Sequence, residues 1–162
     1  MTKEGYLKIK DFLLSHKPLL YIAAALCRFG EAAVYLSYPL FLLILIINKN
    51  LYCIRSVLVC GIGFVLLTLF RKYVNAERPY ERFGFTPLIK KETKGCSFPS
   101  RHTFSAAIIG MSLLAVFPVW GGTVLGLAAV MAALRVLLGV HFIKDTAAGL
   151  LIGFVFGLFS FI

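Results

Sequence analysis

Long stretches without a charged side chain dominate the pattern of this chain. They run over residues 32–48, 56–70, 103–134 and 146–162. A helix needs about 20 mostly apolar residues to cross the hydrocarbon core of a bilayer, with a range of about 17–25. Arg, Lys and Tyr at the ends of the shorter stretches extend them, because these side chains reach the interface with their polar groups. The pattern therefore predicts membrane-spanning helices.

Polar breaks divide these stretches into five expected spans, at residues 31–48, 51–72, 103–117, 122–138 and 146–162. Pro39 is a tolerated kink in the first span, and Pro118 with Gly121–Gly122 is expected to form the turn before the fourth. Residues 11–27 are too short to span and predict an interfacial or partial-span helix that ends near Gly30. We therefore expect an all-α integral membrane helical bundle of about six helices, with residues 1–162 as one domain.

Composition supports a membrane protein, because 60% of the residues are hydrophobic and the mean hydropathy is +0.89. The net charge of +10 raises the possibility of nucleic-acid binding. However, the basic residues lie between the apolar stretches, where loops contact anionic lipid headgroups. The four cysteines form no CxxC pair and no zinc spacing. We therefore expect the lipid bilayer as the partner and no nucleic acid.

Four of the predicted helix ends lie on the same side of the membrane, because consecutive spans alternate in direction. The second span ends near Arg71, the third begins near His102, the fourth ends near Arg135 and the fifth begins near Asp145. The long polar segment 73–101 connects the second span to the third on this side. Its charges before Arg101 are Glu77, Arg78, Glu81, Arg82, Lys90, Lys91, Glu92 and Lys94. The unusual polar residues are thus expected to gather at one membrane surface.

The first cluster there is "RKYVNAERP". Arg71 and Arg78 are seven residues apart, so they point the same way if a helix persists between them. Pro79 disfavours helix at Arg78 and marks an end. Taken alone, two arginines that anchor a helix at the headgroups explain this cluster better than a binding site does.

The second cluster is "FPSRH". Ser100 is expected to be the N-cap of the third span, where the first backbone N–H groups form an anion site. His102 lies in the first turn, beside any ligand bound there. Taken alone, an ordinary helix cap with an interfacial histidine explains this cluster equally well.

The third cluster is "RVLLGVHFIKD". Arg135 lies in the last turn of the fourth span, and Gly139 is expected to turn the chain and free His141 from helix geometry. His141 and Asp145 are four residues apart, so the carboxylate can hold the ring. A carboxylate on one ring nitrogen leaves the other as a nucleophile or base. Ionisable groups in so apolar a region are functional candidates.

Together the three clusters indicate a phosphate site. Arginines, a helix N-terminus and a hydroxyl suit an anion whose oxygens accept several charge-assisted bonds. The chain has no P-loop, so nucleotide binding in that mode is unsupported. We expect no metal and no cofactor, because Asp145 is the one carboxylate among the candidate site residues, and Arg71, Arg78 and Arg135 would repel a divalent cation. Two histidines with different partners predict a nucleophile and a separate proton donor.

The clusters resemble the three-part signature of the type 2 phosphatidic acid phosphatase superfamily, the membrane relatives of the vanadium haloperoxidases. The family pattern is K-x6-RP, PSGH and SR-x5-H-x3-D, and this chain reads "RKYVNAERP", "PSRH" and "LRVLLGVHFIKD". Arg71 takes the place of the usual Lys, with Lys72 as a reserve candidate shifted by one position. Arg101 replaces Gly, whose backbone N–H any residue except proline supplies, and Leu134 replaces Ser.

The resemblance implies a metal-independent phosphatase that acts on a membrane lipid. In this scheme His141 attacks phosphorus, Asp145 orients His141, and His102 protonates the leaving oxygen and then activates water. The phosphate ligands are Arg71, Arg78, Ser100, Arg101 through its N–H, and Arg135. The substrate, which is undecaprenyl pyrophosphate, phosphatidylglycerophosphate or phosphatidic acid, is expected to enter sideways from the bilayer.

Two other classes fit parts of the pattern. An anion transporter or a headgroup-binding scaffold would also use arginines, but transporters usually bind near the midplane and contain repeats. Haloperoxidase chemistry with bound vanadate is the other class, but the haloperoxidase relatives are soluble, whereas this chain has the pattern of an integral membrane protein. The resemblance implies a cell-membrane protein whose site faces the extracytoplasmic side, whereas the excess of Lys and Arg at the site side favours the cytoplasm by the positive-inside rule. We expect the outward orientation, and the sequence leaves the oligomeric state open.

Overall fold

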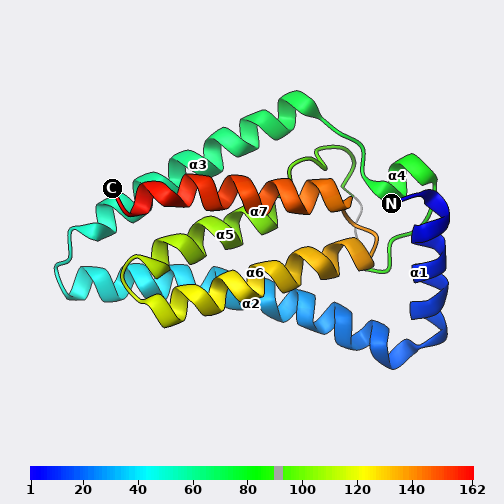
Figure 1. Cartoon of the computed structure of the whole chain (residues 1–162), viewed down its shortest axis with the longest axis horizontal. Coiled ribbons are helices and arrows are strands. Elements are labelled where there is room, and N and C mark those ends of the chain that lie inside the picture. Colours follow the sequence, from blue (N-terminus) through cyan, green and yellow to red (C-terminus); the bar gives the residue numbers. More distant parts are fainter. Residues whose placement is uncertain (90–92) are drawn as a thin grey trace.

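The computed structural model describes residues 1–89 and 93–162, which form a bundle of α-helices (Figure 1). The elements in chain order are α1 (Lys3–Ser15), α2 (Lys17–Ile47), α3 (Tyr52–Val74), α4 (Pro79–Phe83), α5 (Arg101–Leu114), α6 (Pro118–Leu137), α7 (Ile143–Gly157) and the short 3-10 helix η1 (Leu158–Ser160). The predicted all-α bundle is confirmed. Three charges of the polar segment, Lys90, Lys91 and Glu92, lie outside the described residues.

Within the described part of the chain, four helical segments are long and apolar enough to cross a membrane. They contain α2, α3, α6, and α7 with η1. Large apolar side chains such as Leu43, Ile62 and Leu151 are exposed on these helices. Such outer faces are suited to lipid rather than water.

Helix α5 differs from the predicted third span, residues 103–117. It has 14 residues, which corresponds to about 21 Å, whereas a bilayer core is about 30 Å thick. Residues 103–113 are all buried, because α5 lies in the middle of the bundle and packs against α2, α3, α6 and α7 (Figure 1). This apolar stretch therefore forms the protein core instead of a surface toward lipid.

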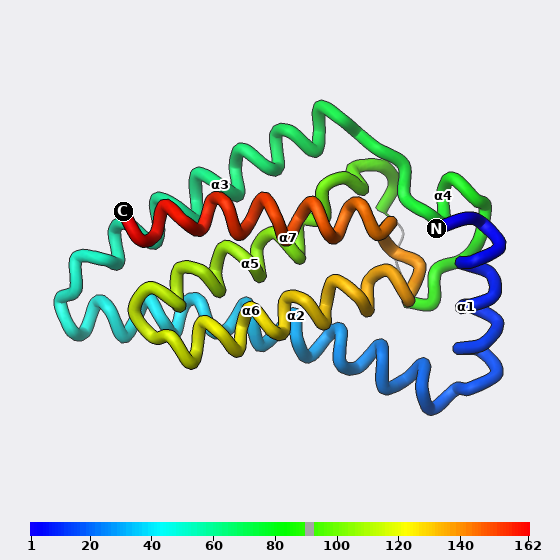
Figure 2. Tube along the Cα trace, viewed as in Figure 1, coloured from blue at the N-terminus to red at the C-terminus, as the bar shows by residue number. Residues whose placement is uncertain are grey.

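The N-terminal prediction is wrong in its boundaries. No helix break occurs at Gly30, because α2 continues through it as a 31-residue helix that also contains Pro39. A Cβ at Gly30 would lie 3.2 Å from Met131 Cγ, so the glycine serves close packing against α6. The break comes instead at His16, between α1 and α2. The short α1 lies across one end of the bundle (Figure 2), whereas residues 17–27, most of the expected interfacial helix, belong to α2.

The turn between α5 and α6 also lies earlier than predicted. Helix α6 begins at Pro118, and Gly121 and Gly122 are helical residues within it. Proline is well suited to the first turn of a helix, where its missing N–H would have no partner. The turn is therefore formed by residues 115–117, which precede the proline.

The predicted gathering of helix ends is observed. The C-terminal ends of α3 and α6, the N-terminal ends of α5 and α7, and α4 all lie at the end of the bundle that α1 crosses (Figure 2). The turns between α2 and α3 and between α5 and α6 lie at the opposite end. The polar segment is thus concentrated at one end of the molecule.

A glycine face on α7 brings α7 and α5 into close contact. A Cβ at Gly149 would lie 2.5 Å from the Ser100 carbonyl oxygen, and one at Gly153 would lie 2.6 Å from that of Phe104. Small residues let helix backbones approach each other in this way. The Ser100 N–H also donates to the Asp145 carbonyl oxygen at 2.8 Å. These contacts fix the N-terminus of α5 against the N-terminus of α7.

Candidate active site

His141 lies just after the end of α6 and is only 1% exposed. Gly139, with φ of +74°, turns the chain there as predicted, and a Cβ at this position would also lie 2.9 Å from the Phe85 ring. Asp145, in the first turn of α7, places Oδ2 3.5 Å from His141 Nδ1. The Phe142 N–H donates to the same Oδ2 at 3.0 Å. The carboxylate is therefore fixed beside one nitrogen of the imidazole.

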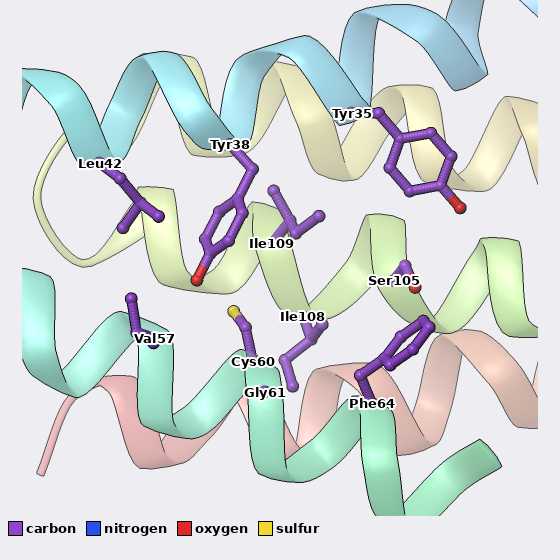
Figure 3. A pocket seen from close by; sticks show the side chains of 10 residues that line it. All are labelled: Tyr35, Tyr38, Leu42, Val57, Cys60, Gly61, Phe64, Ser105, Ile108 and Ile109. Atoms are coloured by element: carbon purple, nitrogen blue, oxygen red, sulfur yellow. The ribbon is translucent and has the colours of Figure 1, made fainter.

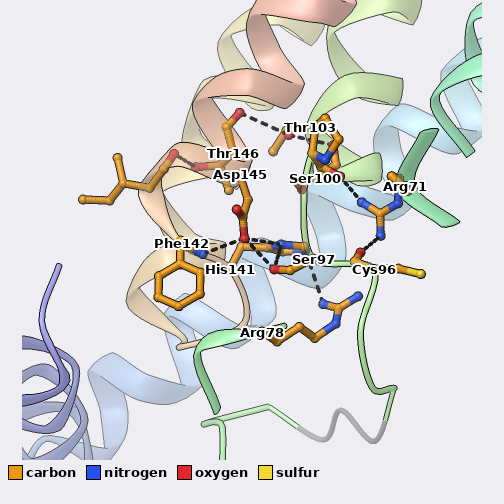
Figure 4. Close-up of polar contacts among 12 residues, drawn as sticks. Arg71, Arg78, Cys96, Ser97, Ser100, Thr103, His141, Phe142, Asp145 and Thr146 are labelled. Atoms are coloured by element: carbon orange, nitrogen blue, oxygen red, sulfur yellow. Dashed lines mark hydrogen bonds and ion pairs between the residues drawn. The ribbon is translucent and has the colours of Figure 1, made fainter. Parts of the chain in front are cut away.

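The other ring nitrogen faces a cation. Arg78 Nη1 lies 3.4 Å from His141 Nε2 (Figure 4). Guanidinium groups only donate hydrogen bonds, so Nε2 is assigned as the unprotonated acceptor. Nδ1 carries the proton, since it faces Asp145 Oδ2 and lies 3.3 Å from Ser97 Oγ. This tautomer is the one a nucleophilic imidazole needs.

Burial lowers the pKa of His141, and the nearby positive charges of Arg78 and Arg135 lower it further. The Asp145 carboxylate acts in the opposite direction, because it would stabilise the imidazolium. The combined effect of burial and the two arginines on the pKa is larger than that of Asp145, so the ring stays neutral in the folded protein.

Arg71 and Arg78 meet through the loop and not along a helix. Helix α3 ends at Val74, and Asn75 adopts a left-handed conformation. The Arg71 guanidinium donates to the carbonyl oxygens of Cys96 and Pro99, and Arg78 Nε donates to that of Gly95 at 3.2 Å. The chain that leads into α5 therefore folds back over both buried arginines and holds them at the site.

Two buried donors at the site have no hydrogen-bond partner among the described residues, namely Ser100 Oγ and Arg135 Nε. Ser100 is the N-cap residue of α5, as predicted, but its hydroxyl makes no capping bond. Buried polar groups are almost always paired. A hydroxyl and a guanidinium N–H of this kind, beside Arg71 and Arg78, fit the oxygens of a bound anion.

His102 is linked to the cluster through a residue of α2. Its Nε2 lies 2.7 Å from Glu31 Oε1, and Glu31 Oε2 accepts a bond from Arg135 Nη2 at 2.8 Å. Arg135 is 3% exposed and His102 16% exposed. The carboxylate of Glu31 therefore joins the second predicted histidine to the third predicted arginine.

The side chains of Arg101 and Lys72 point elsewhere. Arg101 is exposed, and its guanidinium lies over the Phe64 ring of α3, 5.6 Å from the centroid. Lys72 is exposed on α3. Arg101 can still offer its backbone N–H, because it is the first residue of α5 and the first N–H groups of a helix have no partner within it.

Three residues near the site were not found by the sequence analysis. Ser97 donates a hydrogen bond to Asp145 Oδ2, Glu31 pairs with His102, and the Tyr6 hydroxyl donates to the His141 carbonyl oxygen at 3.0 Å. Glu31 carried a usable signal, because it is the only acidic residue between Asp11 and Glu77 and lies in an apolar segment. Nothing in the sequence distinguishes Ser97 or Tyr6.

An apolar cavity of about 370 Å³ lies between α2, α3 and α5 (Figure 3). Tyr35 and Phe64 are among the residues that line it. The Tyr35 ring also lies 6.4 Å from the His102 ring, and Phe64 lies under Arg101. The cavity therefore extends along the bundle from the end that carries the candidate site.

Comparisons with known proteins identify the family and the fold of this chain. The family model of the PAP2 superfamily matches residues 51–162. The structure of LpxE from Aquifex aeolicus is similar with a TM-score of 0.73 and 24% identity, over 97% of this chain and 92% of that one. A PAP2 type phosphatidylglycerolphosphate phosphatase from Bacillus subtilis has a TM-score of 0.65 and 25% identity, over 98% of this chain and 80% of that one. A comparison with curated protein sequences finds no significant match.

Proposed function

Because the chain belongs to the PAP2 superfamily, we propose that it is a multi-pass membrane phosphatase that cleaves a lipid phosphate or diphosphate through a phosphohistidine at His141. The observation that carries this proposal is the different surroundings of the two ring nitrogens of the neutral His141 imidazole. Nδ1 faces Asp145, while Nε2 faces Arg78 among arginines suited to phosphate. Undecaprenyl pyrophosphate, phosphatidylglycerophosphate and phosphatidic acid are the candidate substrates.

In the first step the Nε2 lone pair of His141 attacks phosphorus, and the bond from phosphorus to the leaving oxygen breaks. Asp145 stabilises the positive charge that develops on the ring. Arg71, Arg78, Arg135, the Ser100 hydroxyl and the Arg101 N–H stabilise the charge on the phosphate oxygens. His102 supplies the proton that the leaving oxygen takes up.

In the second step water attacks the phosphohistidine. His102, now neutral, takes a proton from the water as the new P–O bond forms. The P–N bond breaks, and its electron pair returns to Nε2 of His141. Inorganic phosphate leaves, and both histidines regain their starting protonation states.

The donor set supports a reaction without a metal ion. Arg71, Arg78 and Arg135 are all buried at the site, and three fixed positive charges disfavour a divalent cation. The carboxylates of Asp145 and Glu31 are engaged, because Asp145 faces His141 and Glu31 faces His102. The arginines take the place that a metal ion has in many other phosphatases.

A lipid substrate is supported by the cavity between α2, α3 and α5. An acyl or prenyl chain can lie against its apolar wall while the phosphate reaches the polar end of the bundle (Figure 3). The Bacillus subtilis neighbour is described as acting on phosphatidylglycerolphosphate. We therefore propose a lipid phosphate as the substrate class of this chain, without selecting a particular lipid.

The test is release of inorganic phosphate from each candidate lipid by protein purified in detergent, with and without a chelator. We expect release that the chelator does not reduce. Release that stops on chelation would exclude the metal-free mechanism. No release from any lipid phosphate or diphosphate would favour the alternative, a transporter or scaffold that binds anions or headgroups.

Replacement of Asp145 by Asn tests the role of the carboxylate. Asn keeps the size of the side chain but removes the charge that stabilises the imidazolium, so we expect turnover to fall by about 100-fold or more. The melting temperature in detergent should change little by comparison. Near-normal turnover of D145N would contradict the role of Asp145.

A further inference from the structure

Glu31 is a charged residue in the middle of an apolar helix, and the mechanism above gives it no task. It lies on α2, within a segment long and apolar enough to span a membrane, and its side chain is 29% exposed. Ionisable groups in such segments usually serve a function and have a partner. Among the described residues, the partners of Glu31 include His102 on α5 and Arg135 on α6.

The contact with His102 determines which ring nitrogen is left for the substrate. Glu31 Oε1 lies 2.7 Å from Nε2, a short distance typical of a charge-assisted bond. An ionised carboxylate accepts hydrogen bonds but cannot donate one, so Nε2 carries a proton. The other nitrogen, Nδ1, is then the one that can give a proton to a leaving oxygen.

We propose that Glu31 is a positioning residue that holds His102 as the proton donor of the reaction and ties it to Arg135. This inference rests on the proposed function and adds to it a residue outside the three sequence clusters. During the first step the proton on Nδ1 of the His102 imidazolium moves to the leaving oxygen as the P–O bond breaks. His102 becomes a neutral ring that keeps the Nε2 proton on Glu31, and Nδ1 can then accept a proton from water.

Arg135 can hold Glu31 and a phosphate at the same time. Its Nη2 donates to Glu31 Oε2 at 2.8 Å, while its buried Nε finds no partner among the described residues. A guanidinium carries five donors in a fixed fork. The bond between Glu31 and Arg135 therefore need not break when substrate binds. Glu31 orients the guanidinium, and the Nε–H group of Arg135 remains available to the anion.

Replacement of Glu31 by Gln removes the negative charge beside His102 and keeps the size of the side chain nearly unchanged. Among the described residues, the groups that contact His102 or its partner include Glu31 and Tyr35 on α2 and Arg135 on α6, with Arg101 adjacent on α5. Glu31 supplies a negative charge among them. Without it, the imidazolium of His102 loses a stabilising carboxylate and lies near an arginine that is no longer neutralised.

The experiment compares two substrates with different leaving groups. A lipid phosphate has an alkoxide leaving group that needs a proton, whereas p-nitrophenyl phosphate releases a phenolate that is stable without one. We expect E31Q to lower kcat/KM for the lipid phosphate by about tenfold or more, and to leave that for p-nitrophenyl phosphate within a few-fold of the wild type. The basic limb of the pH profile for the lipid should also move to lower pH.

Two further variants make the result specific. E31D keeps the charge and should recover part of the lost activity toward the lipid phosphate. E4Q makes the same chemical change at an exposed residue of α1 and should behave like the wild type with both substrates. Melting temperatures of all variants in detergent show whether the bundle is intact.

Four outcomes overturn the inference. Equal losses with both substrates would assign Glu31 a structural role, and an unchanged pH profile would do the same. Higher activity in E31Q would mean that Glu31 blocks Arg135 and has to be displaced by substrate. A wild-type protein that releases phosphate from neither substrate would overturn the proposed function itself, whereas an active wild type with a normal E31Q variant would overturn only this inference.

Discussion

His141 shows how its surroundings set the protonation state of a single side chain. The residue is almost fully buried, with Asp145 on one side and Arg78 on the other. Burial and the arginines lower the pKa of the ring, against the pull of the carboxylate. The lone pair on Nε2 is therefore present well below the pH at which an ordinary histidine, with a pKa of about 6.5, becomes protonated.

This leads to a prediction for stability against pH. The folded pKa of His141 lies below its unfolded value, so below about pH 6.5 the unfolded chain binds a proton that the folded chain does not. Its contribution to stability is thus present above that pH and is lost as the pH falls. We expect the melting temperature in detergent to fall more steeply between about pH 7.5 and pH 5 in the wild type than in H141Q.

His16 and His102 are common to both proteins, so the difference between the two curves isolates His141. Parallel curves for the wild type and H141Q would show that the ring is not held neutral. The comparison needs no substrate and is independent of the proposed reaction.

At this scale the sequence was informative where spacing is short. His141 and Asp145 are four residues apart, and Gly139 marks the turn before them, so their meeting could be predicted locally. Ser97 and Glu31 could not be placed, because their contacts join segments 48 residues apart for Ser97 and Asp145 and 104 for Glu31 and Arg135. Only the packing of the helices decides such distances.

The contact between α5 and α7 is the element on which the site geometry depends. Gly153 meets backbone, because its Cβ would lie 2.6 Å from the Phe104 carbonyl oxygen and 2.8 Å from Ala107 Cβ. Backbone atoms cannot move aside as the tip of a side chain can. We expect G153A to destabilise the protein by about 1–3 kcal/mol and to lower activity, because α5 carries Ser100 and His102 and α7 carries Asp145.

The matched control is G126A on α6, where a Cβ would meet no atom within 4 Å. Alanine favours helix over glycine by about 0.5–1 kcal/mol, so this variant should be as stable as the wild type or slightly more so. Thermal unfolding in detergent measures both. A G153A variant as stable as G126A would contradict the close contact.

The cavity between α2, α3 and α5 gives a second prediction at this scale. Gly61 lines it, and a Cβ there would meet no atom within 4 Å, so we expect the longer side chain of G61L to occupy the cavity. We expect KM for a long-chain lipid phosphate to rise by roughly tenfold, with little change for a short-chain analogue. G126L, on a helix that does not line the cavity, is the control, and equal KM changes in both variants would argue against a lipid-tail site.

Helix α5 also shows what the hydrophobic pattern leaves undecided. A span that faces lipid and a helix enclosed by other helices are both apolar on every side. The sequence therefore predicted the third span over residues 103–117, whereas the observed α5 is shorter and enclosed. The existence and order of the long helices were predictable, because their charge-free lengths match the bilayer.

For the whole molecule, the open question is which side of the membrane the site faces. Two partly exposed cysteines lie at opposite ends of the bundle, Cys96 in the loop before α5 and Cys53 in the first turn of α3. With the site on the extracytoplasmic side, we expect an impermeant thiol reagent to label Cys96 in intact cells. Cys53 should be labelled only after the membrane is permeabilised.

Single variants identify the labelled residue. C96S should lose the label in intact cells, and C53S should keep it. Cys27 and Cys60 are buried and contribute little. The reverse pattern, with Cys53 labelled in intact cells, would place the site in the cytoplasm. The excess of Lys and Arg at the site end of the bundle favours that orientation.

The bond from Tyr6 to His141 has a consequence for how the protein is made. Its two residues are 135 positions apart, so the ribosome completes most of the chain before the tyrosine that emerges first can meet its partner. Until then the Tyr6 hydroxyl has no His141 carbonyl oxygen to donate to. Under the proposed mechanism, a nascent chain or a truncated product that lacks His141 can therefore enter the bilayer without acting on the lipids around it, because the proposed nucleophile is missing.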